Sequence, residues 1–278
     1  MQSTSSKIID PSTLLVRDVI IYPGESDINF VTDVAVKFDK HYNSISMGEE
    51  MIRNLFASSL MGVPLSPEFE QGSISIITQK VIQIAKNFPH FIDLSSKSQQ
   101  LLLKNNISMV MNLGIVECDS TGNFAEKIRK GLSPEDFEVA MALIQESVAS
   151  QPTKSQFFED QPVCSKSLSL SLRTDDQKTK ERYEILESRV RNKVGFDSNA
   201  TVLLTYLCLF CNDMYNEDID SKERNVIENS KEEIACMLQR YLFASYPSNI
   251  ALTNFTKAME TLIDLREMSD IMNNMRID

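Results

Sequence analysis

The stretch from Gln99 to Val116, QQLLLKNNISMVMNLGIV, restricts the fold of this chain more than any other feature. Its apolar residues recur at helical spacing, but they cover nearly the whole circumference of the helix rather than one stripe. Such a helix must be covered by other elements on several sides, because water at any face would contact apolar surface. The segment therefore predicts a large helical domain with this helix at its centre.

The rest of the chain supports an all-α fold. Only 8 Gly and 9 Pro occur among 278 residues, so few positions interrupt helices. The clearest helix start is Leu132–Asp136, where a serine N-cap is followed by proline and two acids, and Pro67 begins another helix with acids in its first turn. About nine to ten helices are expected, over residues 28–45, 51–61, 67–87, 99–116, 134–149, 180–194, 198–211, 221–245 and 250–275.

Three segments depart from the helical pattern. Residues 1–27 are expected to form a flexible or extended arm, in which the β-branched run Leu14–Tyr22 is typical of a strand. The turn residues Asp119–Asn123 predict a short β-hairpin. Residues 151–178 are polar and predict a mobile insertion, in which the alternating SLSLSL is also compatible with a strand. The remaining chain, 28–278, is expected to be one domain.

Charge and composition exclude several functional classes. A net charge of -11 makes direct contact with DNA unfavourable, because the surface repels phosphate. No apolar run reaches the length of a membrane span, and the N-terminus does not have the pattern of a secretory signal, so an intracellular protein is expected. Thirteen Met and no Trp indicate an adaptable interior. Such an interior suits a ligand cavity and a solid methionine-rich core equally well.

The cysteines predict neither disulfides nor a metal site. Their odd number and scattered spacing do not form a disulfide framework. Cys208 and Cys211 form a C-x-x-C inside an apolar run with no second Cys or His pair nearby, so buried structural thiols are expected. No cofactor is expected either. The five positions are Cys118, Cys164, Cys208, Cys211 and Cys236.

The segment Ile84–Lys104, IAKNFPHFIDLSSKSQQLLLK, resembles the signature of nuclear-receptor ligand-binding domains. The signature consists of an Ala-Lys, a Pro-x-Phe, a Leu-Ser, and a Gln followed by Leu-Leu-Lys. One departure is Ser98, where the family usually has an aspartate before the glutamine. The matching residues are Ala85-Lys86, Pro89-His90-Phe91, Leu94-Ser95, Gln99 and Leu102-Leu103-Lys104.

Two later segments resemble further helices of this family. The stretch 195–242 is similar to the eighth and ninth helices, and 254–275 is similar to the long dimerisation helix. The resemblance implies a three-layer helical sandwich that regulates transcription by RNA polymerase II in the nucleus. No cysteine cluster supplies zinc fingers, and only EMSDIMNNMRID follows Arg266, so a receptor without a DNA-binding domain and without a terminal activation helix is expected.

The resemblance also implies a coregulator groove. In this family the third and fourth helices form an apolar groove for an amphipathic LxxLL helix. Lys86 and Lys104 correspond to the lysines at its end, where a positive charge favours the C-terminus of the incoming helix. Because the activation helix is missing, corepressor binding or dimerisation is expected to dominate. The expected groove residues are Ala85, Lys86, Gln99, Leu103 and Lys104.

A pocket for a small apolar ligand, such as a sterol, fatty acid or xenobiotic, is implied between the third, fifth and penultimate helices. Its expected lining is Ile76, Ile77, Lys80, Ile84, Ser108, Met109, Met111, Asn112, Met259, Ile263 and Met268. A homodimer, or a heterodimer with a partner like the retinoid X receptor or ultraspiracle, is implied along the last helix. The expected dimerisation residues are Phe255, Met259, Leu262, Leu265 and Arg266.

Two other functions compete with this interpretation. The first is a ligand-independent dimerisation or corepressor module with the same fold. The second is an all-α enzyme similar to terpene synthases, because Asn212-Asp213, Asn216 and Asp220 lie at offsets close to a magnesium site. However, Asn216 replaces a hydroxyl residue, Asp220 replaces a glutamate, and no aspartate-rich motif on an earlier helix faces this segment. His41 and His90 are the only histidines and belong to no catalytic motif, so no enzyme is expected.

Overall fold

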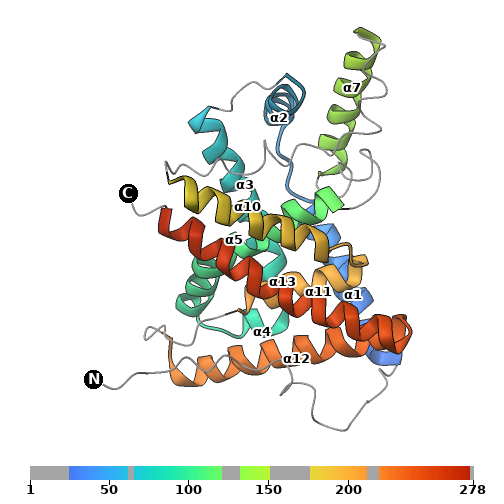
Figure 1. The fold of residues 1–278 in the computed structure, drawn as a ribbon, viewed down its shortest axis with the longest axis vertical. Helices are drawn as coiled ribbons and strands as arrows, with labels where there is room; N and C mark the ends of the chain where they lie inside the picture. Colours follow the sequence, from blue (N-terminus) through green and yellow to red (C-terminus); the bar gives the residue numbers. More distant parts are fainter. Residues whose placement is uncertain (1–24, 62–65, 121–131, 151–175, 212–218, 276–278) are drawn as a thin grey trace.

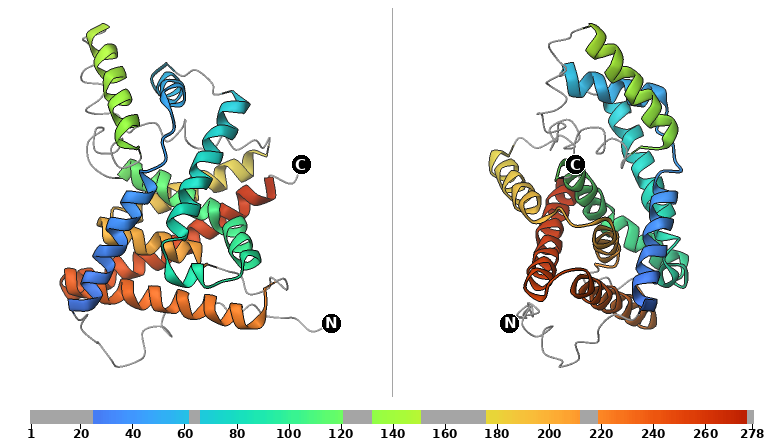
Figure 2. Two further views of the ribbon diagram at one scale, coloured as in Figure 1. Left: turned by 180° about the vertical axis from the view of Figure 1, so that it is seen from behind. Right: turned by 90° about the vertical axis from the view of Figure 1, so that its right-hand side faces the viewer.

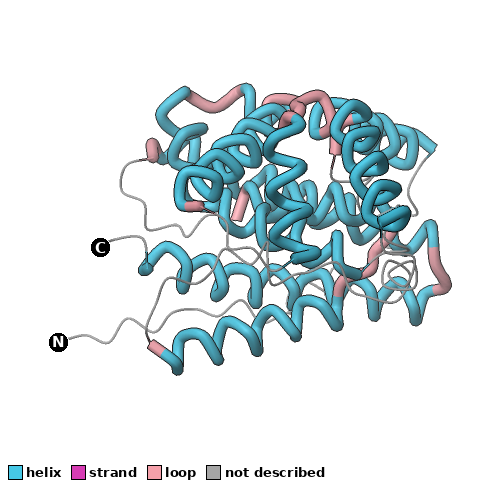
Figure 3. Tube along the Cα trace, turned by 90° about the horizontal axis from the view of Figure 1, so that it is seen from above, coloured by secondary structure: helices cyan, strands magenta, loops and turns pink. Residues whose placement is uncertain are grey.

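The computed structural model of the chain describes residues 25–61, 66–120, 132–150, 176–211 and 219–275. Those residues form ten helices and no strand, which confirms the all-α prediction and the expected number of helices (Figure 1). Figure 3 shows the same residues as helices joined by short loops. The helices are α1 (Glu25–Tyr42), α2 (Glu49–Met61), α3 (Pro67–Ala85), α4 (Pro89–Ile92), α5 (Ser96–Ser120), α7 (Pro134–Ser150), α10 (Gln177–Lys193), α11 (Ser198–Leu209), α12 (Ser221–Ser245) and α13 (Ser248–Met275).

Side-chain caps account for several helix starts. The Ser133 hydroxyl accepts the Asp136 backbone N–H at 3.1 Å, so the predicted serine cap of α7 is present. Ser66 caps α3 through the Phe69 N–H at 3.2 Å, immediately before Pro67. Such caps bond backbone donors that have no partner inside the helix, and the local sequence is enough to specify them.

The predicted irregular segments differ from the structure where the two overlap. Helix α5 continues to Ser120 and includes Asp119, so the predicted hairpin does not start there. Helix α1 begins at Glu25, and α10 begins at Gln177, inside the ends of the predicted arm and insertion. The predicted strands, at 14–22 and in the SLSLSL run, lie outside the described residues, as do positions 121–123.

The main body has three layers of helices (Figure 2). Helices α5 and α11 pack together in the middle, with α12 against α11. Helices α1 and α3 pack on one side of this layer, and α10 and α13 pack as a pair on the other. The central segment 99–116 therefore lies in α5, which contacts α3, α10, α11 and α13 and is covered on the several sides that its all-round apolar pattern requires.

A smaller unit lies at one end of the body, where α2 packs against α7. Ile52 of α2 and Ala140 of α7 are buried there, outside the main core cluster. The Asp136 carboxylate of α7 accepts the Met47 N–H and the Ser46 hydroxyl, both at 2.7 Å, just before α2 begins. The start of α2 is therefore fixed by a residue almost ninety positions away.

Candidate functional site

The signature segment forms a sharp corner between α3 and α5. Helix α3 ends at Ala85, the four-residue α4 follows, and α5 begins at Ser96. Lys86 and Lys104 are exposed on either side of this corner, one after the last turn of α3 and one in the third turn of α5. Among the apolar residues between them, Ile92 is 57% exposed, and Leu101 and Leu103 are half-buried. The other four are buried, with exposures of 5% or less; they are Phe88, Phe91, Leu94 and Leu102.

The Gln99 side chain closes the corner. Its amide nitrogen lies 3.0 Å from the Phe91 carbonyl oxygen, 3.3 Å from that of Ile92 and 3.0 Å from that of Leu94. These carbonyls lie at the end of α4 and in the turn before α5, where the helical bond pattern stops, so a side-chain donor adds bonds to them; the Phe91 carbonyl also accepts the Leu94 N–H at 3.3 Å. Gln99, which was predicted to line the groove, therefore uses its side chain to hold α4 against the start of α5.

Helix α12 supplies a carboxylate to the same corner. One Glu223 oxygen accepts the Ser95 N–H at 2.6 Å, and the other accepts the hydroxyls of Ser95 at 3.0 Å and Ser98 at 2.6 Å. The bond from Ser98, followed by that from the Ser95 backbone, lowers the pKa of Glu223. A second contact joins α4 to α12, where His90 Nε2 lies 2.9 Å from a carboxylate oxygen of Glu233. The family pattern did not indicate either α12 contact, because both partners lie more than a hundred positions from the signature.

An aromatic cluster fixes the inner side of the corner. The centroid of the Phe88 ring lies 4.5 Å from that of Tyr206 in α11 and 5.5 Å from that of Phe210, the C-cap residue of α11. The Tyr206 hydroxyl donates to the Ile84 carbonyl at 3.1 Å, and the same oxygen accepts the Asn87 N–H at 3.0 Å at the end of α3. Burial raises the pKa of Tyr206, so this hydroxyl keeps its proton and remains a donor.

The predicted groove residues thus separate into two groups. Lys86 and Lys104 are exposed, and Leu103 is half-buried and packs against the core. Ala85 is completely buried, so it contacts the interior and does not line an open groove. Gln99 is engaged with α4 as described. Two positive side chains are therefore exposed on either side of a corner whose inner side chains are apolar.

The predicted pocket residues on α5 and α13 meet at the interface of these two helices. The Ser108 and Ser269 hydroxyls are hydrogen-bonded to each other. The Asn112 side-chain oxygen accepts the Tyr183 hydroxyl at 3.0 Å, and its nitrogen lies 3.5 Å from the Met272 sulfur. Burial raises the pKa of Tyr183, which keeps this hydroxyl protonated. The predicted pocket methionines Met109, Met111 and Met268 are buried.

The α3 residues predicted for the same pocket have different surroundings. Lys80 is 2% exposed, and its Nζ lies 4.8 Å from the centre of the Tyr42 ring of α1. Ile84 is buried in the core, while Ile76 and Ile77 are half-buried. Lys80 therefore points towards α1, whereas Ile84 belongs to the same core cluster as Met109 and Met268, and Ile77 packs against that cluster.

The buried face of the last helix, α13, differs from the face that was predicted to be buried. Ile263 was expected to line the pocket, but its side chain is 62% exposed on the outer face of α13. Phe255 and Leu265 were expected on a dimerisation surface, but both are buried. Arg266 also points inwards, where its guanidinium donates to the Asn106 side-chain oxygen at 3.2 Å. Met259 and Leu262 are half-buried. Apolar residues are spread around much of α13, so the periodicity alone did not fix which face is covered.

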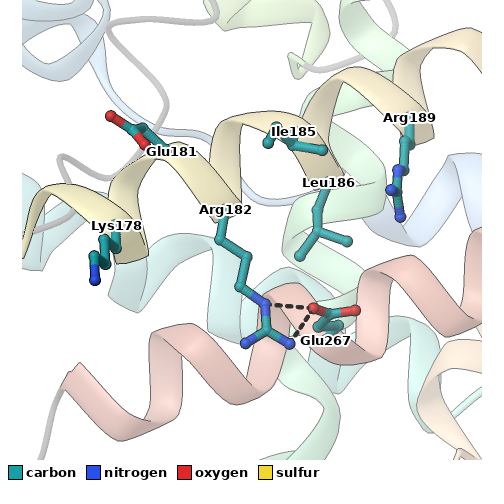
Figure 4. A pocket seen from close by; sticks show the side chains of 7 residues that line it. All are labelled: Lys178, Glu181, Arg182, Ile185, Leu186, Arg189 and Glu267. Carbon is teal, nitrogen blue, oxygen red and sulfur yellow. Dashed lines mark hydrogen bonds and ion pairs between the residues drawn. The ribbon is translucent and has the colours of Figure 1, made fainter.

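A shallow hollow of about 330 Å³ lies between α10 and α13. Figure 4 shows Arg182 reaching across it to Glu267, with guanidinium nitrogens 2.5 and 2.6 Å from one carboxylate oxygen. Three of its side chains carry positive charge (Lys178, Arg182, Arg189) and two carry negative charge (Glu181, Glu267). Because the charges nearly cancel and Arg182 is already paired, this hollow is a weaker candidate than the corner.

The residues considered for other chemistry give no site in the described part of the chain. No group of three His, Cys, Asp or Glu side chains lies together as a metal site among the described residues. Asp220 is the N-cap residue of α12, and the other three positions compared with terpene synthases lie outside the described residues. Cys208 is a buried free thiol, as predicted, whereas Cys211, also predicted to be buried, is a half-buried free thiol. No helix that the structure describes is long and apolar enough to cross a membrane.

Sequence comparisons identify no relative for this chain. No model of a known protein family matches it, and no curated protein matches it.

Proposed function

We propose that this chain is a regulatory domain similar to nuclear-receptor ligand-binding domains, and that it binds an amphipathic coregulator helix at the α3–α5 corner. The observation that carries the proposal is the corner itself. Two exposed lysines, Lys86 and Lys104, lie just after the end of α3 and in α5, and the turn between α4 and α5 is held by the Gln99 side chain. The three-layer packing of the helices around α5 supports the same proposal.

Recognition at such a corner has a simple physical basis. The last carbonyls of a short bound helix lack partners and carry a partial negative charge. A lysine can bond those carbonyls while its aliphatic stem covers apolar side chains of the ligand. Leucines at i, i+3 and i+4 of the ligand would lie against the half-buried apolar surface of α5, which includes Leu101 and Leu103.

The test is a binding titration with a labelled LxxLL peptide and a longer corepressor peptide. Each of Lys86→Glu and Lys104→Glu is expected to weaken binding at least about two- to fivefold, the effect of losing one charge at a helix end. Lys178→Glu changes the net charge equally at an exposed site on α10 and is the matched control. Equal affinities for all three variants, or no binding of either peptide, would refute the proposal.

A small apolar ligand is the second element of the proposed function. Four buried methionines, Met109, Met111, Met268 and Met272, lie on α5 and α13. Their unbranched thioether side chains adapt more readily than branched residues to an inserted molecule. Native mass spectrometry of the purified chain tests this element. A copurified sterol, fatty acid or similar lipid supports a ligand-regulated receptor, and an apoprotein with peptide binding supports the ligand-independent corepressor module.

Dimerisation, directly with a second copy or with a partner like the retinoid X receptor, is proposed along the outer face of α13. Two of the residues predicted for this role, Phe255 and Leu265, are buried, and the other three are half-buried. Leu252 and Ile263 expose apolar surface on the same helix, at 42% and 62%. Sedimentation of the wild type and of Ile263→Glu tests whether this face joins two chains. Action in the nucleus on transcription follows from the same proposal, through the partner and not through contact with DNA by this chain.

A further inference from the structure

The start of α5 has an incomplete capping box. Ser95 is the N-cap residue, because its hydroxyl accepts the Ser98 N–H at 3.3 Å and its carbonyl accepts the Gln99 N–H at 2.9 Å. In a complete capping box, an acidic or amide side chain at the third helical position bonds the N–H of the N-cap residue. That position is Ser98 here, and its hydroxyl donates to Glu223 instead of accepting from Ser95.

Glu223 occupies the place of the missing acid. Its carboxylate accepts the Ser95 N–H at 2.6 Å, the bond that a side chain at position 98 would otherwise make. It also accepts the hydroxyls of both serines. Glu223 lies in the first turn of its own helix, α12, so the positive ends of two helix dipoles meet at one carboxylate.

We propose that Glu223 is a positioning residue that completes the capping box of α5 from α12 and thereby sets the orientation of Lys104 relative to Lys86. The capping itself is independent of any function, whereas its effect on peptide binding rests on the proposed coregulator groove. Helix α12 also contacts α4 through His90 and Glu233, which lie 2.9 Å apart, so α12 holds the corner on both sides of Ser95. Figure 1 shows α12 running alongside α4.

This arrangement couples α12 to the groove. The path from Lys86 to Lys104 passes through α4 and the first two turns of α5. If Ser95 loses its acceptor, the first turn of α5 frays, and the Gln99 bonds to α4 lose their support. An α12 movement that withdraws Glu223 would therefore loosen the peptide site without any contact to the peptide.

The test exchanges the position of the acid. Glu223→Ala is expected to lower hydrogen-exchange protection at residues 95–99 by about two- to thirtyfold, the range for a lost N-terminal cap. Adding Ser98→Asp in the same chain restores an acid at the third helical position and is expected to recover protection. Ser98→Asp alone places two carboxylates against each other and is expected to lower protection. Glu232→Ala, at an exposed site on α12, is the matched control.

Peptide affinity is measured on the same variants and separates the two proposals. A loss of affinity in Glu223→Ala that Ser98→Asp recovers supports the positioning role, because affinity then follows the capping of Ser95 and not the residue at position 223. Unchanged protection in Glu223→Ala, failure of Ser98→Asp to restore it, or unchanged affinity despite lost protection overturns the positioning role. Affinity that is insensitive to Lys86→Glu and Lys104→Glu overturns the proposed groove instead, whatever the protection shows.

Discussion

Exchanging Gln99 for glutamate tests how the corner between α3 and α5 is held. The side-chain nitrogen of Gln99 lies within 3.3 Å of three carbonyl oxygens at the end of α4. An amide nitrogen carries two hydrogens, so two of these bonds form at full strength at any moment. At a net value of about 1 kcal/mol each, their loss costs about 2 kcal/mol. Glutamate is the same size but carries no donor when ionised.

The charge of the new side chain adds to this cost. A carboxylate at position 99 would face carbonyl oxygens, so it must swing into solvent or take up a proton. We therefore expect Gln99→Glu to lower the free energy of unfolding by about 2 to 4 kcal/mol, and Gln99→Met by about 2 kcal/mol. The assay is equilibrium unfolding in urea, with the slope compared between variants to detect a change in the surface exposed on unfolding.

The neighbouring residue provides the control. Gln100 is exposed, and Gln100→Glu adds the same charge to the same helix turn. Surface substitutions of this kind change stability by about 0.5 kcal/mol or less. If the unfolding free energies of Gln99→Glu and Gln100→Glu agree within about 0.5 kcal/mol, the three carbonyl bonds do not hold the corner and the reasoning is wrong.

Three further predictions test the packing of other elements. Leu265→Ala should lower the free energy of unfolding in urea by about 2 to 5 kcal/mol, because Leu265 is 0% exposed. Ile263→Ala should lower it by less than about 0.5 kcal/mol, because Ile263 is 62% exposed. Similar losses for the two variants would contradict the orientation of α13. Tyr183→Phe should cost about 1 to 3 kcal/mol in thermal unfolding, since it leaves the buried Asn112 oxygen without its donor, and an unchanged melting temperature would refute that bond. Burial alone would raise the pKa of Asp136, but hydrogen bonds from the segment before α2 outweigh it and lower the pKa. Its ionised form therefore stabilises the fold above the ordinary aspartate pKa of about 3.9, and this stability is lost as pH falls through the lower pKa of the folded state. The wild type should lose more stability than Asp136→Asn on acidification, and parallel pH profiles would contradict the prediction.

The helices themselves could be predicted from the sequence because their signals are local. A serine cap with proline and acids after it, as at Ser133, satisfies or favours the first turn within a few residues. The apolar circumference of 99–116 likewise required a covered helix, and α5 is in contact with helices on several sides. Periodicity therefore determined the fold class and the centre of the domain.

The sequence did not determine which partners meet. Ile263 and Leu265 are two positions apart and both apolar, yet the packing of α13 against α5 and α10 exposes one and buries the other. Glu223 reaches Ser95 across 128 positions, and no periodicity relates them. Helix formation depends on residues that are close together in the sequence. The bonds of Glu223 at the corner depend on where α12 lies, and that position is set by the packing of apolar helix faces in the tertiary structure.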